Sequence, residues 1–149
     1  MNKRNDMIIE CALKTRKFYI PNDGKMKLQF FHVDDLCKII EKIIETRPKE
    51  HILNVGNTEL VDINTFIELC YKVVGAPLEK VYVTNHNNQR DCFSFYNYEY
   101  ILDLSRQKEL LPEVKNLFEG LKESYEWFRD NRNEVVKKGY IEFIQKNFE

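Results

Sequence analysis

Residues 34–45 read DDLCKIIEKIIE, the stretch of the chain with the clearest periodicity. Its apolar residues recur at helical spacing, at Leu36, Ile39, Ile40, Ile43 and Ile44. That spacing predicts an amphipathic helix over Asp34–Glu45 that buries one face. We expect Asp34 or Asp35 to cap its N-terminus and Pro48 to end it, because proline cannot continue the hydrogen-bond ladder.

The segments on either side of this helix are predicted to be strands. Apolar and polar residues alternate over Lys25–Phe30 after a turn at Asn22-Asp23-Gly24, which is typical of a strand. The short apolar run His51–Val55, stopped by Gly56, predicts a buried strand. The order strand, helix, strand indicates an α/β fold.

The rest of the chain predicts four helices, one strand and one loop. Asp62 offers an N-cap to a second helix that ends at Gly75. That helix has an apolar stripe at Ile63, Phe66, Ile67, Cys70, Val73 and Val74. A strand is expected at Lys80–Thr84, followed by a loop over Asn85–Tyr100. Helices are expected after Asp103, at 117–131 and from Glu134 towards Phe148, with Gly139 a weak point of the last.

Composition restricts the classes of function. The 149 residues, 43% hydrophobic and 32% charged, are expected to form a single domain spanning 1–149. A formal net charge of −1 gives no global attraction for nucleic acid or an anionic membrane. Neither a membrane span nor a signal-type apolar segment is apparent, which predicts a cytoplasmic protein.

Cysteine and histidine patterns give no support to a metal centre. The four cysteines, Cys11, Cys37, Cys70 and Cys92, form no CxxC pair and are expected to be small buried apolar residues. The three histidines, His32, His51 and His86, lack the spacing that puts two on one helical face. We therefore expect no metal.

Four motifs, in this order, resemble the NAD-dependent epimerase/dehydratase family, the extended or atypical short-chain dehydrogenases/reductases. They are FFHVDD at 30–35, ILNVG at 52–56, DLSRQKEL at 103–110 and EGLKESYEW at 119–127. The resemblance implies a partial Rossmann-like C-terminal region, with a few strands, mixed or parallel, and about five helices. Asn5–Phe18 resembles the family helix that follows the catalytic region, so the resemblance also implies that the N-terminal dinucleotide-binding half is missing.

Two features that nicotinamide chemistry needs in that family are missing from the 149 residues. A Gly-rich turn lets the backbone approach the pyrophosphate, but no two of the five glycines lie close together. None of the eight tyrosines is followed four residues later by the lysine that would lower its pKa. We therefore predict no catalysis and no cofactor bound by this chain, with NAD or NADP expected for full-length family members.

The resemblance implies a substrate-binding role, with Gln29, His32, Arg90 and Tyr96 as the candidate residues. Leu28 stands where nucleotide-sugar enzymes of the family commonly have a diphosphate-binding arginine, and Gln29 where they have aspartate. A guanidinium fork cannot be replaced by leucine, so the expected small molecule is a sugar derivative but not clearly a nucleotide-diphospho-sugar. Asp34 and Asp35 can serve as helix caps or contact substrate directly.

Two alternative functions remain open. Residues 92–100, CFSFYNYEY, resemble a stretch of the chloroplast stem-loop RNA-binding proteins, and aromatic side chains beside Arg90 can stack on bases or simply pack the loop. The neutral charge disfavours this RNA-binding alternative. An independent interaction domain is the other alternative.

The resemblance also predicts an exposed strand edge and an exposed apolar surface. In the family the strand corresponding to His51–Val55 joins the large parallel sheet, and the helix corresponding to Asp34–Glu45 covers that sheet. Without the other strands, the strand edge and the apolar stripe of the helix would be exposed. We expect the missing half to cover this surface, or the chain to self-associate or to rearrange so that its aromatic segment or C-terminal helix covers it.

Overall fold

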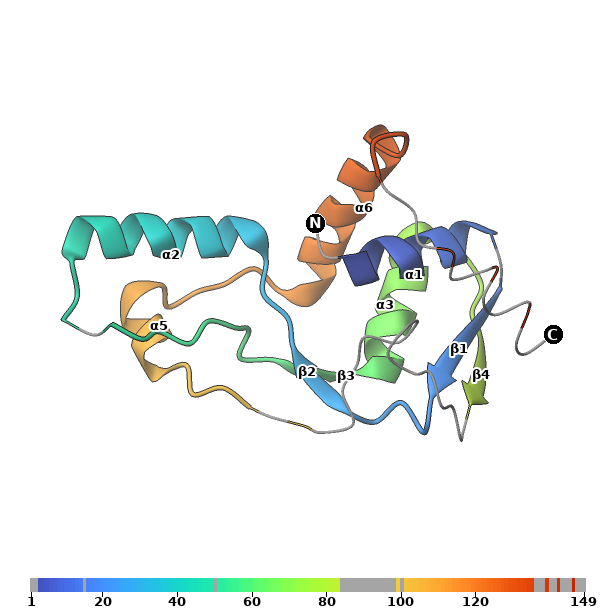
Figure 1. Ribbon diagram of the computed structural model, residues 1–149, viewed down its shortest axis with the longest axis horizontal. Helices are drawn as coiled ribbons and strands as arrows, with labels where there is room; N and C mark the ends of the chain where they lie inside the picture. Colours follow the sequence, from blue (N-terminus) through green and yellow to red (C-terminus); the bar gives the residue numbers. More distant parts are fainter. Residues whose placement is uncertain are drawn as a thin grey trace.

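The computed structural model describes residues 3–14, 16–49, 51–83, 99, 101–135, 139, 142 and 146. These residues form five helices and two small sheets (Figure 1). The elements are α1 (Lys3–Lys14), β1 (Lys17–Pro21), β2 (Lys27–Gln29), α2 (Val33–Thr46), β3 (Leu60–Asp62), α3 (Ile63–Val74), β4 (Glu79–Val83), α5 (Ser105–Leu110) and α6 (Leu117–Asp130). The predicted α/β class, with mixed short strands and about five helices, is confirmed.

Strands β1 and β4 pair in parallel, with Phe18 opposite Lys80 and Ile20 opposite Tyr82. Strand β1 was not predicted, because its partner lies some sixty residues away in the sequence; the resemblance instead extended the first helix to Phe18, whereas α1 ends at Lys14. Strands β2 and β3 pair antiparallel, with Leu28 opposite Val61. The predicted strand at Lys25–Phe30 is thus confirmed in its central part.

The helix predicted at Asp34–Glu45 is confirmed as α2, but its cap is not an aspartate. His32 is the N-cap, and its Nδ1 accepts a hydrogen bond from the Asp34 N–H at 3.3 Å. Both aspartates lie in the first turn, where their charge is favourable near the positive end of the helix dipole. The helix ends at Thr46, and its C-cap Arg47 takes the left-handed conformation at φ 47° just before Pro48.

Helix α3 confirms its predicted caps. The Asp62 carboxylate accepts a hydrogen bond from the Thr65 N–H at 2.7 Å, and Gly75 adopts φ 76°, a conformation that glycine reaches without steric cost. The strand after it is confirmed as β4 and the short helix after Asp103 as α5. Helix α6 confirms the one predicted at 117–131. The predicted loop at Asn85–Tyr100 and the last helix fall almost entirely outside the described residues.

The strand predicted at His51–Val55 is wrong. This segment has no strand pairing in the described residues, and Ile52 and the adjacent Gly56 bond to side chains instead. The Gly56 N–H and carbonyl both bond the Gln107 amide, and the Ile52 carbonyl accepts from Arg106 at 3.0 Å. Apolar periodicity cannot reveal that a run lacks a neighbouring strand to pair with.

The described elements divide into two parts in Figure 1. We call α1, β1, α3, β4 and α6 the body, and α2, residues 51–57 and α5 the arm; β2 and β3 lie between them. The body holds the apolar core, where Phe30 from the connecting strand region stacks on Phe66 with ring centroids 4.1 Å apart. Phe18, Ile20, Phe66 and Ile67 are completely buried there.

Cysteine burial agrees with the prediction at two positions and not at a third. Cys11 and Cys70 are buried, and burial raises the pKa of the Cys11 thiol to about 12, assisted by the neighbouring Glu10 charge. Both thiols are therefore protonated at neutral pH and chemically inert. Cys37 is exposed on α2, contrary to expectation, because it lies on the side of the helix that no described element covers. Cys92 lies outside the described residues.

Candidate functional site

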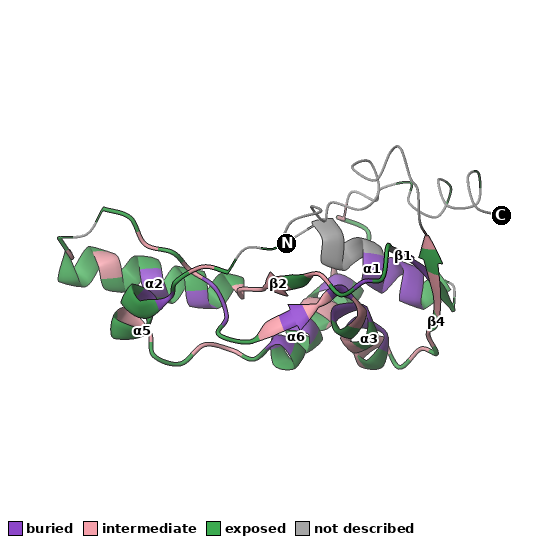
Figure 2. Ribbon diagram, turned by 90° about the horizontal axis from the view of Figure 1, so that it is seen from below, coloured by how far each residue is buried: buried purple, intermediate pink, exposed green. Residues whose placement is uncertain are grey.

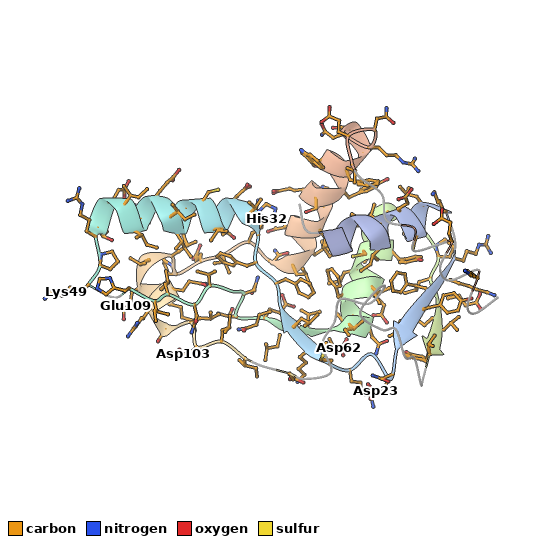
Figure 3. All side chains as sticks on the ribbon, viewed as in Figure 1. Asp23, His32, Lys49, Asp62, Asp103 and Glu109 are labelled. Atoms are coloured by element: carbon orange, nitrogen blue, oxygen red, sulfur yellow. The ribbon has the colours of Figure 1, made fainter. Side chains whose placement is uncertain are left out.

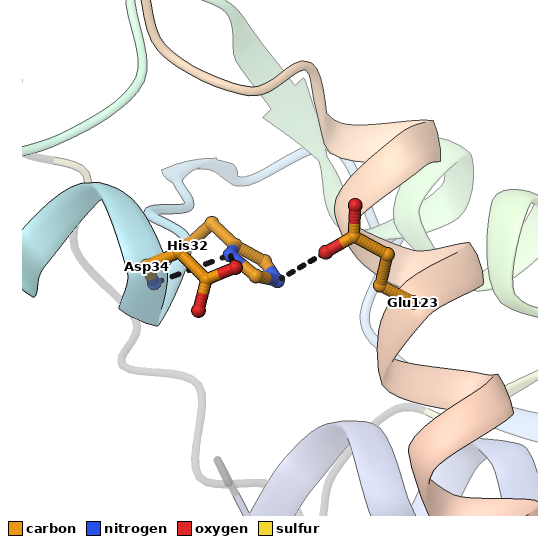
Figure 4. Close-up of side chains that lie close together, drawn as sticks. All are labelled: His32, Asp34 and Glu123. Carbon is orange, nitrogen blue, oxygen red and sulfur yellow. Dashed lines mark hydrogen bonds and ion pairs between the residues drawn. The ribbon is translucent and has the colours of Figure 1, made fainter.

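Where α2 leaves the body, charged side chains from two distant segments meet. His32, Asp34 and Asp35 come from the start of α2, Lys115 from the segment before α6, and Glu123 from α6. Figure 4 shows three of them, with the His32 ring between the two carboxylates. We call these five residues the arm–body junction.

The His32 ring lies between two acidic groups. Its Nδ1 is 3.5 Å from Asp34 Oδ2 and its Nε2 is 3.6 Å from Glu123 Oε2. Because Nδ1 accepts the Asp34 N–H, the neutral ring carries its proton on Nε2, directed towards Glu123. The ring also packs on Gly120, where an added Cβ would lie only 3.0 Å from His32 Cδ2. A glycine at this position lets the imidazole approach α6.

Lys115 bridges the same two carboxylates. Its Nζ lies 3.2 Å from Asp34 Oδ2 and forms a close ion pair with Glu123. The hydrogen bond to Glu123 is the main reason that the pKa of Lys115 is raised above its usual value, and the bond to Asp34 adds to it. The ammonium is therefore charged at neutral pH and supplies the cation that this acidic group requires.

Asp35 is the buried member of the junction, with 1% of its surface exposed. Its Oδ1 accepts from Lys38 Nζ at 2.8 Å and its Oδ2 from the Lys115 backbone N–H at 2.7 Å. Burial works against ionisation, but these two bonds and the nearby ammonium charges outweigh it, so the pKa of this carboxyl lies below its usual value. Asp35 thus fixes the segment before α6 against the start of α2.

A second set of polar contacts holds the arm together. We call the side chains of Gln29, Asn57 and Gln107 the amide clamp. The Gln107 amide, 1% exposed, accepts from the Gly56 N–H at 2.7 Å and donates to the Gly56 carbonyl at 2.8 Å. Gln29 accepts from the Leu102 N–H at 2.7 Å and donates to the Asn57 carbonyl at 3.3 Å. Asn57 donates to the Lys115 carbonyl at 3.0 Å, which connects the clamp to the junction.

The four residues that the sequence suggested for substrate binding are not brought into one described site. His32 lies in the arm–body junction, and Gln29 lies in the amide clamp with its amide bonded to backbone. Arg90 and Tyr96 lie outside the described residues. In this structure Asp34 pairs with Lys115, and Asp35 accepts a hydrogen bond from Lys38. Both aspartates therefore bond to side chains of this chain.

Sequence reasoning missed Lys115, Glu123 and Gln107. Lys115 meets Asp35 across 80 residues and Gln107 meets Gly56 across 51, so no local pattern joins them. A glutamine or a lysine near a short helix is normally solvated, and only the three-dimensional contact distinguishes these from such residues.

One group among the described residues has the donor types and spacing of a metal site. Ligand atoms of His32, Asp34 and Glu123 lie within 4.8 Å of one another. Imidazole with two carboxylates would suit a divalent ion. Lys115 Nζ is bonded to both carboxylates, however, and an ion would have to displace this ammonium. The donor set therefore fits an internal salt-bridge network better than a metal centre.

No family model matches the sequence. The structure resembles the NAD complex of dTDP-glucose 4,6-dehydratase from Bacillus anthracis, with a TM-score of 0.69 and 21% identity, over 87% of this chain and 40% of that chain. The chain has part of an epimerase/dehydratase fold.

Two further relatives match a similar share of the chain. UDP-glucose 4-epimerase from Thermotoga maritima, solved with UDP-glucose, is 26% identical, with a TM-score of 0.67 over 84% of this chain and 38% of that chain. An uncharacterised protein of Methanocaldococcus jannaschii is 27% identical over 125 residues, which are 82% of this chain and 36% of that protein. The chain thus spans less than half the length of the relatives it matches.

None of the helices in the described part of the chain has the length and apolar character needed to cross a membrane.

Proposed function

We propose that this chain is the substrate-side, C-terminal region of an NAD(P)-dependent epimerase- or dehydratase-like protein and does not catalyse hydride transfer alone. The observation that carries the proposal is the extent of the structural match, 87% of this chain against 40% of a dehydratase in complex with NAD. The 149 residues contain neither a Gly-rich phosphate-binding turn nor a tyrosine followed four residues later by lysine. We assign phosphate binding and proton transfer to a dinucleotide-binding half outside these residues.

The amide clamp supports a positioning role for Gln29 within this function. Leu102, which Gln29 bonds through both its N–H and its carbonyl, is where the chain returns to the arm after the segment containing Arg90 and Tyr96. Gln29 therefore holds one end of the segment that we propose carries the direct substrate contacts. His32, at the end of the connection from β2 to α2, holds that connection against α6.

The substrate class we propose is a sugar derivative. Relatives of the same fold were solved with UDP-glucose and with UDP-glucuronic acid. Leu28 is partly buried against the core, so the position at which an arginine would grip a diphosphate contributes apolar packing instead. A sugar recognised mainly by hydrogen bonds, with weak dependence on a diphosphate, fits this substitution.

Calorimetry of the purified chain tests the proposal, with NAD and NADP as one pair of ligands and UDP-glucose with glucose as the other. We expect no saturable binding of either nicotinamide cofactor, because the backbone cradle for the pyrophosphate is absent. UDP-glucose is expected to bind only weakly. Saturable binding of NAD at micromolar affinity would overturn the proposal. A Gln29→Ala variant serves as a control, since it should weaken any sugar binding and leave the cofactor result unchanged.

Single-stranded RNA at two salt concentrations belongs in the same series. Binding that weakens steeply with salt would favour the RNA-binding alternative over the substrate-side proposal. Absence of binding at low salt would remove that alternative.

A further inference from the structure

We draw no further inference here: the strongest candidate, the exposed apolar face of α2 with Val33, Ile40 and Ile44 (largely green in Figure 2, with its side chains drawn in Figure 3), is the face that the dinucleotide-binding half of the proposed function would cover, and nothing in the part of the chain that the structure describes shows another occupant.

Discussion

The body and the arm are stabilised by different kinds of contact. In the body, α1, α3 and α6 bury a continuous set of aromatic and aliphatic side chains against β1 and β4. In the arm the fully buried side chains include Asp35 and Gln107 alongside Ile39. Hydrophobic burial tolerates imprecise geometry, whereas a buried polar group is stable only while its specific partner is in place. The body should therefore fold as an autonomous unit and the arm should depend on a few hydrogen bonds.

The largest effect is expected in the body. Phe66→Ala removes a completely buried ring that stacks on Phe30 and should lower the free energy of unfolding by about 3–5 kcal/mol. Urea denaturation followed by circular dichroism measures this. The control is Ile40→Ala on the exposed side of α2, which should change the same free energy by less than about 0.5 kcal/mol at concentrations where the chain is monomeric. Equal losses in the two variants would contradict the division into body and arm.

A smaller and local effect is expected in the amide clamp. Gln107→Ala leaves the Gly56 N–H and carbonyl without their partner and should destabilise the arm by about 1–3 kcal/mol. Amide exchange should quicken at residues 51–57 and in α5 while α1 and α3 are unaffected. Gln107→Glu places a buried carboxylate against the Gly56 carbonyl, so at neutral pH it should destabilise the arm at least as much as Gln107→Ala. Uniform acceleration over the whole chain would argue against a local clamp.

The junction should give a pH-dependent effect. Because the pKa of Asp35 is lowered in the folded state, its contribution to stability is present above the unfolded pKa and is lost as pH falls through the folded value. Asp35→Asn should therefore lower stability at pH 7 by about 1–2 kcal/mol and have progressively less effect below pH 4, the ordinary aspartate range. Thermal melting of both proteins from pH 7 to pH 3 measures the difference. A difference that grows on acidification would contradict the assigned role of Asp35.

Sequence reasoning predicted the elements whose signals are local. The helix α2, the helix α3 with its buried apolar stripe, the Asp62 cap and the Gly75 terminus depend on residues within one helix and were confirmed. Of the apolar residues predicted to form the buried face of α2, only Ile39 is fully buried. The resemblance to epimerases and dehydratases, built from four short motifs, agrees with a structural match that covers most of the chain.

Sequence reasoning failed where an element or a contact depends on residues that are distant in the chain. The run His51–Val55 has the composition of a buried strand but no described strand beside it, and β1 pairs with a strand about sixty residues later. The clamp bond between Gly56 and Gln107 and the junction bond between Asp34 and Lys115 join residues 51 and 81 positions apart, through polar groups that resemble solvated surface residues in the sequence. Cys37 was expected to be buried because its neighbours are apolar, yet it lies on the open side of α2.

Hydrogen exchange read by mass spectrometry, at concentrations where the chain is monomeric, tests most directly whether the arm opens while the body stays folded. We predict that α1, α3 and β4 exchange only through global unfolding, with protection that follows the denaturant-measured free energy. We predict that α2, residues 51–57 and α5 exchange together through a smaller opening that leaves the body folded. Equal protection in the two parts, lost together with increasing denaturant, would contradict the account.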